Sequence, residues 1–131
     1  MQEPEQYEVE SIRDTLLNLN NQGTQALAAG HFRIALECYA QAAADLRPDE
    51  DHLAAVIYEN MGLALMRLGE WRAAQRAFLR ALDGHPTHRE LSLRLLILAF
   101  FNDAKPQWGR RMLAEYEQHF GPHPDGLRTG E

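Results

Sequence analysis

Two histidine pairs are the residues in this sequence whose types and spacing come closest to metal chemistry. His85 and His88 are three positions apart, and His119 and His123 are four apart. A zinc site needs three or four converging ligands, each held by further hydrogen bonds. Neither pair has a cysteine beside it, and a proline stands inside each. We therefore predict no metal site and no bound cofactor.

Catalytic motifs are also missing from the chain. It has no nucleophile elbow, phosphate-binding loop, dinucleotide fingerprint or zinc-protease motif. The single cysteine, Cys38, has no cationic cluster beside it in the sequence that would activate a thiol. We expect it to be a buried or half-buried side chain. The sequence thus predicts a protein that is not an enzyme.

A row of arginines is the remaining cluster of like residues. Arg72, Arg76 and Arg80 recur every four positions, the spacing of one face of a helix. Such a row is most often a solvated outer face. The alternative is a docking strip for an acidic partner, or for the acidic N-terminal segment of a second copy. We keep these three residues as a secondary candidate site.

Composition narrows the choice of partners. The net charge is −6, with 19 acidic and 13 basic residues, so the mean field repels phosphate and nucleic-acid binding is not expected. Lys105 is the only lysine, a bias typical of a GC-rich bacterial genome. The longest apolar run, Leu95 to Phe101, is far shorter than the ~20 residues that span a bilayer. The first ten residues, MQEPEQYEVE, do not resemble a signal peptide. We expect a cytoplasmic protein without membrane contact.

The elements that position these residues come from an internal repeat. The segments GTQALAAGHFRIALECYAQA (23–42) and GLALMRLGEWRAAQRAFLRA (62–81) align without a gap at an offset of 39. A glycine that follows a helix provides a left-handed turn, and alanines allow two helices to cross closely. Six positions match in type: Gly23 with Gly62, Gly30 with Gly69, Phe32 with Trp71, Ala35 with Ala74, Tyr39 with Phe78 and Ala42 with Ala81.

This pattern resembles the tetratricopeptide repeat (TPR) family, whose unit is a helix pair of ~34 residues. The resemblance implies an all-α fold, a right-handed α-hairpin solenoid of three TPR-like repeats with six helices. The repeats would cover about 16–49, 55–86 and 88–120, within a domain at 6–120. Residues 1–5 and the tail 121–131 are expected to be loose. The third repeat matches least, because Leu96 stands where the first glycine is expected.

Helix signals agree with six helices. Apolar spacing and turn residues predict them near 7–29, 32–46, 51–68, 71–83, 88–101 and 107–119. Thr87 and Glu90 form a capping box that would open the fifth helix. Pro106 suits the first turn of the sixth.

The resemblance also implies which residues face the inner, concave wall. The family's carboxylate clamp needs lysines and asparagines that this chain lacks at those positions, and Glu59 and Glu90 would repel a carboxylate. What remains is mostly apolar. The inward positions are Leu17, Asn20, Thr24, Leu27 and Ala28; Val56, Glu59, Leu63, Met66 and Arg67; and Glu90, Leu93, Ile97, Phe100 and Phe101.

An apolar inner wall predicts a protein-binding groove. Its partner would be an apolar helix or extended peptide of another protein, and the chain would act as an adaptor or small chaperone. Ordinary core packing is the competing interpretation, above all for Phe100 and Phe101 against the last helix. Two other functions stay open: a self-associating scaffold (a homo-oligomer), and a non-catalytic accessory subunit of an enzyme or secretion complex.

Overall fold

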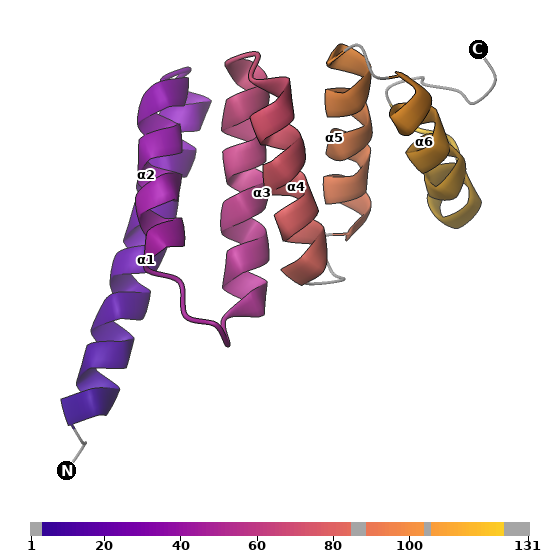
Figure 1. The fold of residues 1–131 in the computed structure, drawn as a ribbon. Helices are drawn as coiled ribbons and strands as arrows, with labels where there is room; N and C mark the ends of the chain where they lie inside the picture. Colours follow the sequence, from indigo (N-terminus) through magenta and orange to yellow (C-terminus); the bar gives the residue numbers. More distant parts are fainter. Residues whose placement is uncertain (1–3, 85–88, 104–105, 125–131) are drawn as a thin grey trace.

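The computed structural model describes residues 4–84, 89–103 and 106–124, and every regular element in these residues is a helix. Neighbouring helices pack in chain order, as Figure 1 shows. Each bound lies within three residues of its predicted position, which confirms the all-α expectation. The helices are α1 Pro4–Ala28, α2 Phe32–Ala44, α3 Asp51–Arg67, α4 Trp71–Gly84, α5 Arg89–Asn102 and α6 Pro106–Phe120.

Two glycines end the first helices of the first two pairs. Gly30 has φ +82° and Gly69 has φ +75°, the left-handed backbone that lets the chain reverse. After α1, the amide of His31 donates to the Ala26 carbonyl at 2.8 Å, and the Gly30 amide donates to Leu27 at 3.1 Å. This hydrogen-bond pair is a Schellman motif. The predicted left-handed glycines are confirmed.

Small residues let the two helices of a pair approach closely. A Cβ added to Gly23 would lie closer than 3.0 Å to the Tyr39 ring, and one added to Gly62 would meet the Phe78 ring in the same way. Both rings are fully buried. The repeated glycine and the repeated aromatic residue are therefore one packing unit, used once between α1 and α2 and once between α3 and α4.

The core forms three successive clusters that link one pair to the next. Leu16 and Tyr39 pack with Ile57 of α3, and Phe78 packs with Leu96 and other α5 residues. The last cluster joins α5 to α6 and contains Leu93, Ile97, Leu113 and Tyr116. Each pair of helices thus covers an apolar face of its neighbour, which holds the helices in chain order.

The third pair keeps the helix spacing of the second at an offset of 35. Trp71 begins α4 and Pro106 begins α6, while Arg67 ends α3 and Asn102 ends α5. At this offset Gly62 corresponds to Ile97, which is fully buried. The sequence alignment had used Leu96 instead, so its register in α5 was wrong by one residue.

Chain ends and turns differ in part from expectation. α1 already begins at Pro4, inside the stretch expected to be loose. His123 is buried, although the tail was expected to be loose from Gly121. Pro106 opens α6 as predicted. The capping box at Thr87 lies outside the described residues. Over the described residues, none of the helices combines the length and hydropathy needed to cross a bilayer.

Candidate functional site

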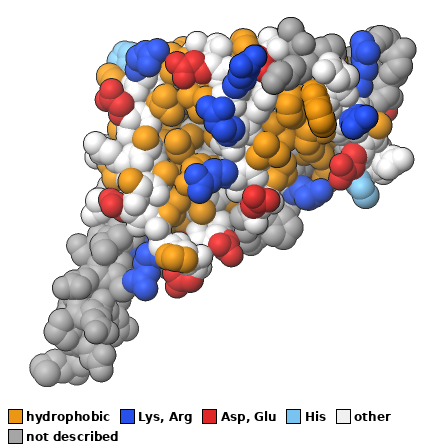
Figure 2. Space-filling view, in the orientation of Figure 1, with side chains coloured by type: hydrophobic (Ala, Val, Ile, Leu, Met, Phe, Trp, Pro, Cys, Tyr) orange, Lys and Arg blue, Asp and Glu red, His pale blue; other side chains and the backbone are white. Residues whose placement is uncertain are grey.

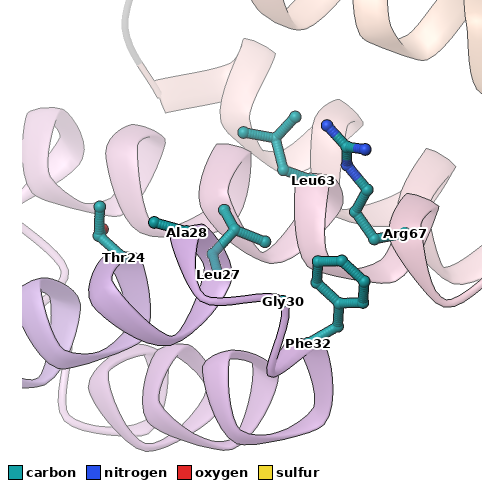
Figure 3. Close-up of a pocket in the computed structure, with 7 residues that line it drawn as sticks. All are labelled: Thr24, Leu27, Ala28, Gly30, Phe32, Leu63 and Arg67. Carbon is teal, nitrogen blue, oxygen red and sulfur yellow. The ribbon is translucent and has the colours of Figure 1, made fainter.

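A cavity of about 460 Å³ lies where α1 ends, α2 begins and α3 ends. Figure 3 shows the side chains around it. Its lining consists of Thr24, Leu27, Ala28, Gly30, Phe32, Leu63 and Arg67. Five of these seven were predicted inward positions, so the structure brings residues from two consecutive first helices around one hollow. Phe32 and Gly30 were predicted only as a helix anchor and a turn.

Local structure explains how these residues meet. Leu63 and Arg67 are one turn apart on α3 and share a face. The left-handed turn at Gly30 reverses the chain directly after α1 and brings Phe32 to the same hollow. In Figure 3 the Phe32 ring lies beside Arg67, with Leu27 on the side of α1. The walls are therefore mainly aliphatic and aromatic.

Thr24 is held in place by hydrogen bonds at one end of the cavity. Its hydroxyl donates to the Asn20 carbonyl at 2.9 Å, and it lies 3.0 Å from the Tyr39 hydroxyl. Burial raises the pKa of Tyr39 above its usual 10.0, and the Thr24 hydrogen bond opposes part of that rise. The tyrosine is thus neutral at physiological pH, and its hydrogen bond with Thr24, in which either hydroxyl can donate, links α1 to α2.

Arg67 supplies the only charge among the lining residues. It is exposed and stands in the last turn of α3, where a cation is favoured by the helix dipole. The cavity therefore offers apolar walls with one guanidinium at its edge. This arrangement can hold apolar side chains and a neighbouring carboxylate.

Three predicted groove residues lie in the core instead. Leu93 and Ile97 pack against α6 and are 3% and 0% exposed. Glu59 is buried and accepts a hydrogen bond from the Ser92 hydroxyl at 3.0 Å. These side chains are inaccessible to a partner. Glu59 does not line the cavity, because it is buried against Ser92.

Other predicted inward residues are spread along the first helices. Leu17 is exposed, and Asn20 accepts a hydrogen bond from the Asn60 amide at 2.9 Å, a link between α1 and α3 that the sequence did not reveal. Val56 and Met66 are half-buried. None of the four lines the cavity.

The two phenylalanines of α5 serve packing. Phe101 lies against Gly109 of α6, where an added Cβ would come within 2.8 Å of its ring. Phe100 packs on the cluster around Phe78. Glu90 accepts a hydrogen bond from the Tyr116 hydroxyl, so the Glu90 side chain is also directed toward α6.

The corrected register identifies α5 positions that the sequence analysis missed. At an offset of 35, Leu63 corresponds to Leu98 and Val56 to Leu91, and both of these leucines are half-buried rather than buried. The signal was available in Gly109, because this small buried residue matches Ala74 at the same offset. Leu91 and Leu98 therefore replace Glu90 and Ile97 as the α5 residues facing the same side as Val56 and Leu63.

The arginine row on α4 divides into three environments. Arg72 forms an ion pair with Asp103 at 3.5 Å. Arg80 lies over the Tyr58 ring, 4.7 Å from its centroid. Arg76 is exposed and forms no salt bridge with another described residue. The row is thus an outer surface on which Arg72 pairs with the end of α5, while Arg76 and Arg80 border α3.

Metal-binding groups do not cluster among the described residues. His85 and His88 lie outside those residues. His119 is exposed, whereas His123 is buried, with its ring 5.2 Å from that of Tyr116 and its Nε2 3.3 Å from the Arg94 carbonyl. Cys38 is a half-buried free thiol.

Comparison with protein-family models and with curated protein sequences finds no match for this chain.

Proposed function

We propose that this chain is a protein-interaction adaptor or small chaperone that binds an apolar segment of another protein in the cavity between α1, α2 and α3. The observation that supports this proposal is the lining itself. Predicted inward residues of two successive first helices meet there, and three of these five, Leu27, Ala28 and Leu63, are apolar, as is Phe32 beside them. The repeated glycine–aromatic packing favours a tetratricopeptide-like solenoid as the framework. The partner would be another polypeptide.

The chemistry of the cavity suggests what the bound segment carries. Leu27, Phe32 and Leu63 suit one or two aliphatic or aromatic side chains. Arg67 at the edge suits an acidic residue next to them in the partner. Because the walls contribute through desolvation, binding should depend only weakly on salt.

Peptide selection against the full-length protein tests the proposal and reveals which side chains the cavity prefers. Peptides from a random display library are enriched on the wild-type chain, and their dissociation constants are then measured on variants. Leu63→Glu places a carboxylate in the apolar wall, where binding would desolvate it. We expect a loss of at least about 2 kcal/mol, or about thirtyfold. The matched control, Ile34→Glu on exposed α2 surface, should bind like wild type.

Folding must be separated from binding, because Leu63 is half-buried. Ala28→Glu provides the second variant, since Ala28 is exposed at the cavity and its replacement buries no charge in the fold. Both variants are checked by thermal melting. If the selected peptides bind Leu63→Glu and Ala28→Glu as well as wild type, or if only Arg76→Glu prevents binding, the cavity is not the site.

A further inference from the structure

A second groove lies on the opposite side of α3. It has a volume of about 450 Å³ and includes Met61 and Leu65 of α3 and Ala73 and Ala77 of α4. Met61 and Leu65 are each two residues from Leu63, which turns them about 200° away around the helix. This groove is therefore separate from the cavity of the proposed function. Figure 2 shows hydrophobic side chains gathered in this region, with basic side chains among them.

The rim of this groove is positively charged. Arg76 and Arg80 are exposed and one helical turn apart. Arg80 is held over Tyr58, which also borders the groove. Neither arginine forms a salt bridge with a residue that the structure describes, and no acidic residue lines the groove. The surface thus combines an apolar floor with two available cations, and it suits a helix that carries both aliphatic and acidic residues.

The chain itself contains such a helix at its N-terminal end. α1 has 25 residues but α2 only 13, so the first part of α1 extends beyond the end of α2, and this part includes residues 4–12, as Figure 1 shows. At 1.5 Å per residue this arm is about 13 Å long. Residues 1–12 include four glutamates and no lysine or arginine. Within the arm, Glu5, Glu8, Val9 and Ile12 have the i, i+3, i+4, i+7 spacing of one helical face.

We propose that this arm, residues 4–12, docks in the groove between α3 and α4 of a second copy of the chain. The arm cannot reach the groove of its own copy, because it is a continuous part of α1 and points away from α3 and α4. In a second copy, the carboxylates of Glu5 and Glu8 would meet the guanidiniums of Arg76 and Arg80, since each pair is one helical turn apart. The aliphatic residues Val9 and Ile12 would cover the apolar floor of the groove. The contact joins unlike patches, so it links copies head to tail or closes a pair in which both arms are exchanged.

Charge reversal on each side of the contact tests this proposal. The full-length protein is studied by sedimentation velocity and light scattering over a range of concentrations. Wild type should associate as concentration rises, and added salt should weaken the association. The groove variant Arg76→Glu/Arg80→Glu and the arm variant Glu5→Arg/Glu8→Arg should each shift the midpoint to at least about thirtyfold higher concentration, because like charges then face each other.

Mixing the two variants gives the decisive result. In an equimolar mixture, the unchanged arm of one variant meets the unchanged groove of the other, and the two reversed surfaces also complement each other. Association should therefore return, which a folding defect could not produce. The matched control Arg110→Glu/Arg111→Glu makes the same charge change on exposed positions of α6, where Arg111 also lies over an aromatic ring. This control should associate like wild type.

Several outcomes overturn the proposal. They are a wild-type chain that stays monomeric at every concentration, a groove variant that associates normally, and a mixture that does not recover. If Leu63→Glu abolishes self-association but Arg76→Glu/Arg80→Glu does not, the contact between copies is at the cavity instead. Peptide binding at the cavity can succeed or fail independently of all these results, because the two surfaces share no lining residue.

Discussion

Replacing Gly62 by alanine measures the close approach of α3 to α4. The added Cβ would lie closer than 3.0 Å to three atoms of the Phe78 ring, and that ring is fully buried. Overpacking of this kind costs about 1–3 kcal/mol. Alanine in a helix interior is more stable than glycine by about 1 kcal/mol, which offsets part of this cost. We therefore expect Gly62→Ala to lower the free energy of unfolding by up to about 2 kcal/mol.

A double-mutant cycle with Phe78→Leu isolates the clash from the helix propensity. Without the ring, the new methyl group has space, and Gly62→Ala should stabilise the protein by about 1 kcal/mol. The coupling between the two sites should then be about 1–3 kcal/mol. Urea unfolding followed by circular dichroism gives all four free energies.

Gly69→Ala is the matched control for this cycle. An added Cβ at Gly69 meets no atom within 4 Å, but the residue has φ +75°. Its cost, about 1–2 kcal/mol, comes from left-handed backbone and should be the same with or without Phe78→Leu. If Gly62→Ala stabilises the protein when Phe78 is present, the ring does not pack on the glycine, and the repeat that pairs Gly62 with Gly23 loses its physical basis.

Two further predictions concern buried residues of the same pairs. Ala35→Leu and Ala74→Leu should each cost about 1–3 kcal/mol in urea unfolding, because both alanines are fully buried at helix crossings; unchanged stability in both would contradict this packing. Tyr39→Phe should reduce the loss of stability at alkaline pH. Burial raises the pKa of Tyr39, so its stabilising contribution is present below the unfolded pKa of 10.0 and is lost as pH rises through the folded pKa. Thermal melts of wild type and Tyr39→Phe across that pH range test this prediction. Equal losses of stability in the two proteins would mean that Tyr39 is solvated.

The first two helix pairs could be predicted from the sequence because each has local signals that tertiary packing reinforces. Gly30 and Gly69 must adopt left-handed backbone, so they mark helix ends by a steric rule alone. Tyr39 and Phe78 need a facing residue without a side chain, which ties Gly23 and Gly62 to them. These constraints leave little freedom in register.

The third pair lacks those signals, and this explains the error of one residue in α5. Among the glycines that the structure describes, none packs on the ring of Tyr116. The α5 sequence is also apolar on nearly all sides, so its periodicity does not indicate a buried face. The burial of Ile97 beside the half-buried Leu98 depends on where α6 lies, which is a tertiary contact. Gly109 and Pro106 would have fixed the register through the spacing of the second helix.

The position of α3 in the middle of the row explains why the two candidate surfaces are separate. α3 contacts α1, α2, α4 and α5, so most of its circumference is covered. Two narrow stripes remain, one with Leu63 and Arg67 and the other with Tyr58 and Met61. The two stripes lie about half a turn apart around α3, so a partner bound on one stripe does not touch the residues of the other. Single substitutions can therefore alter one surface without changing the other. The same geometry would let one copy bind a peptide in its cavity while its groove holds the arm of a second copy.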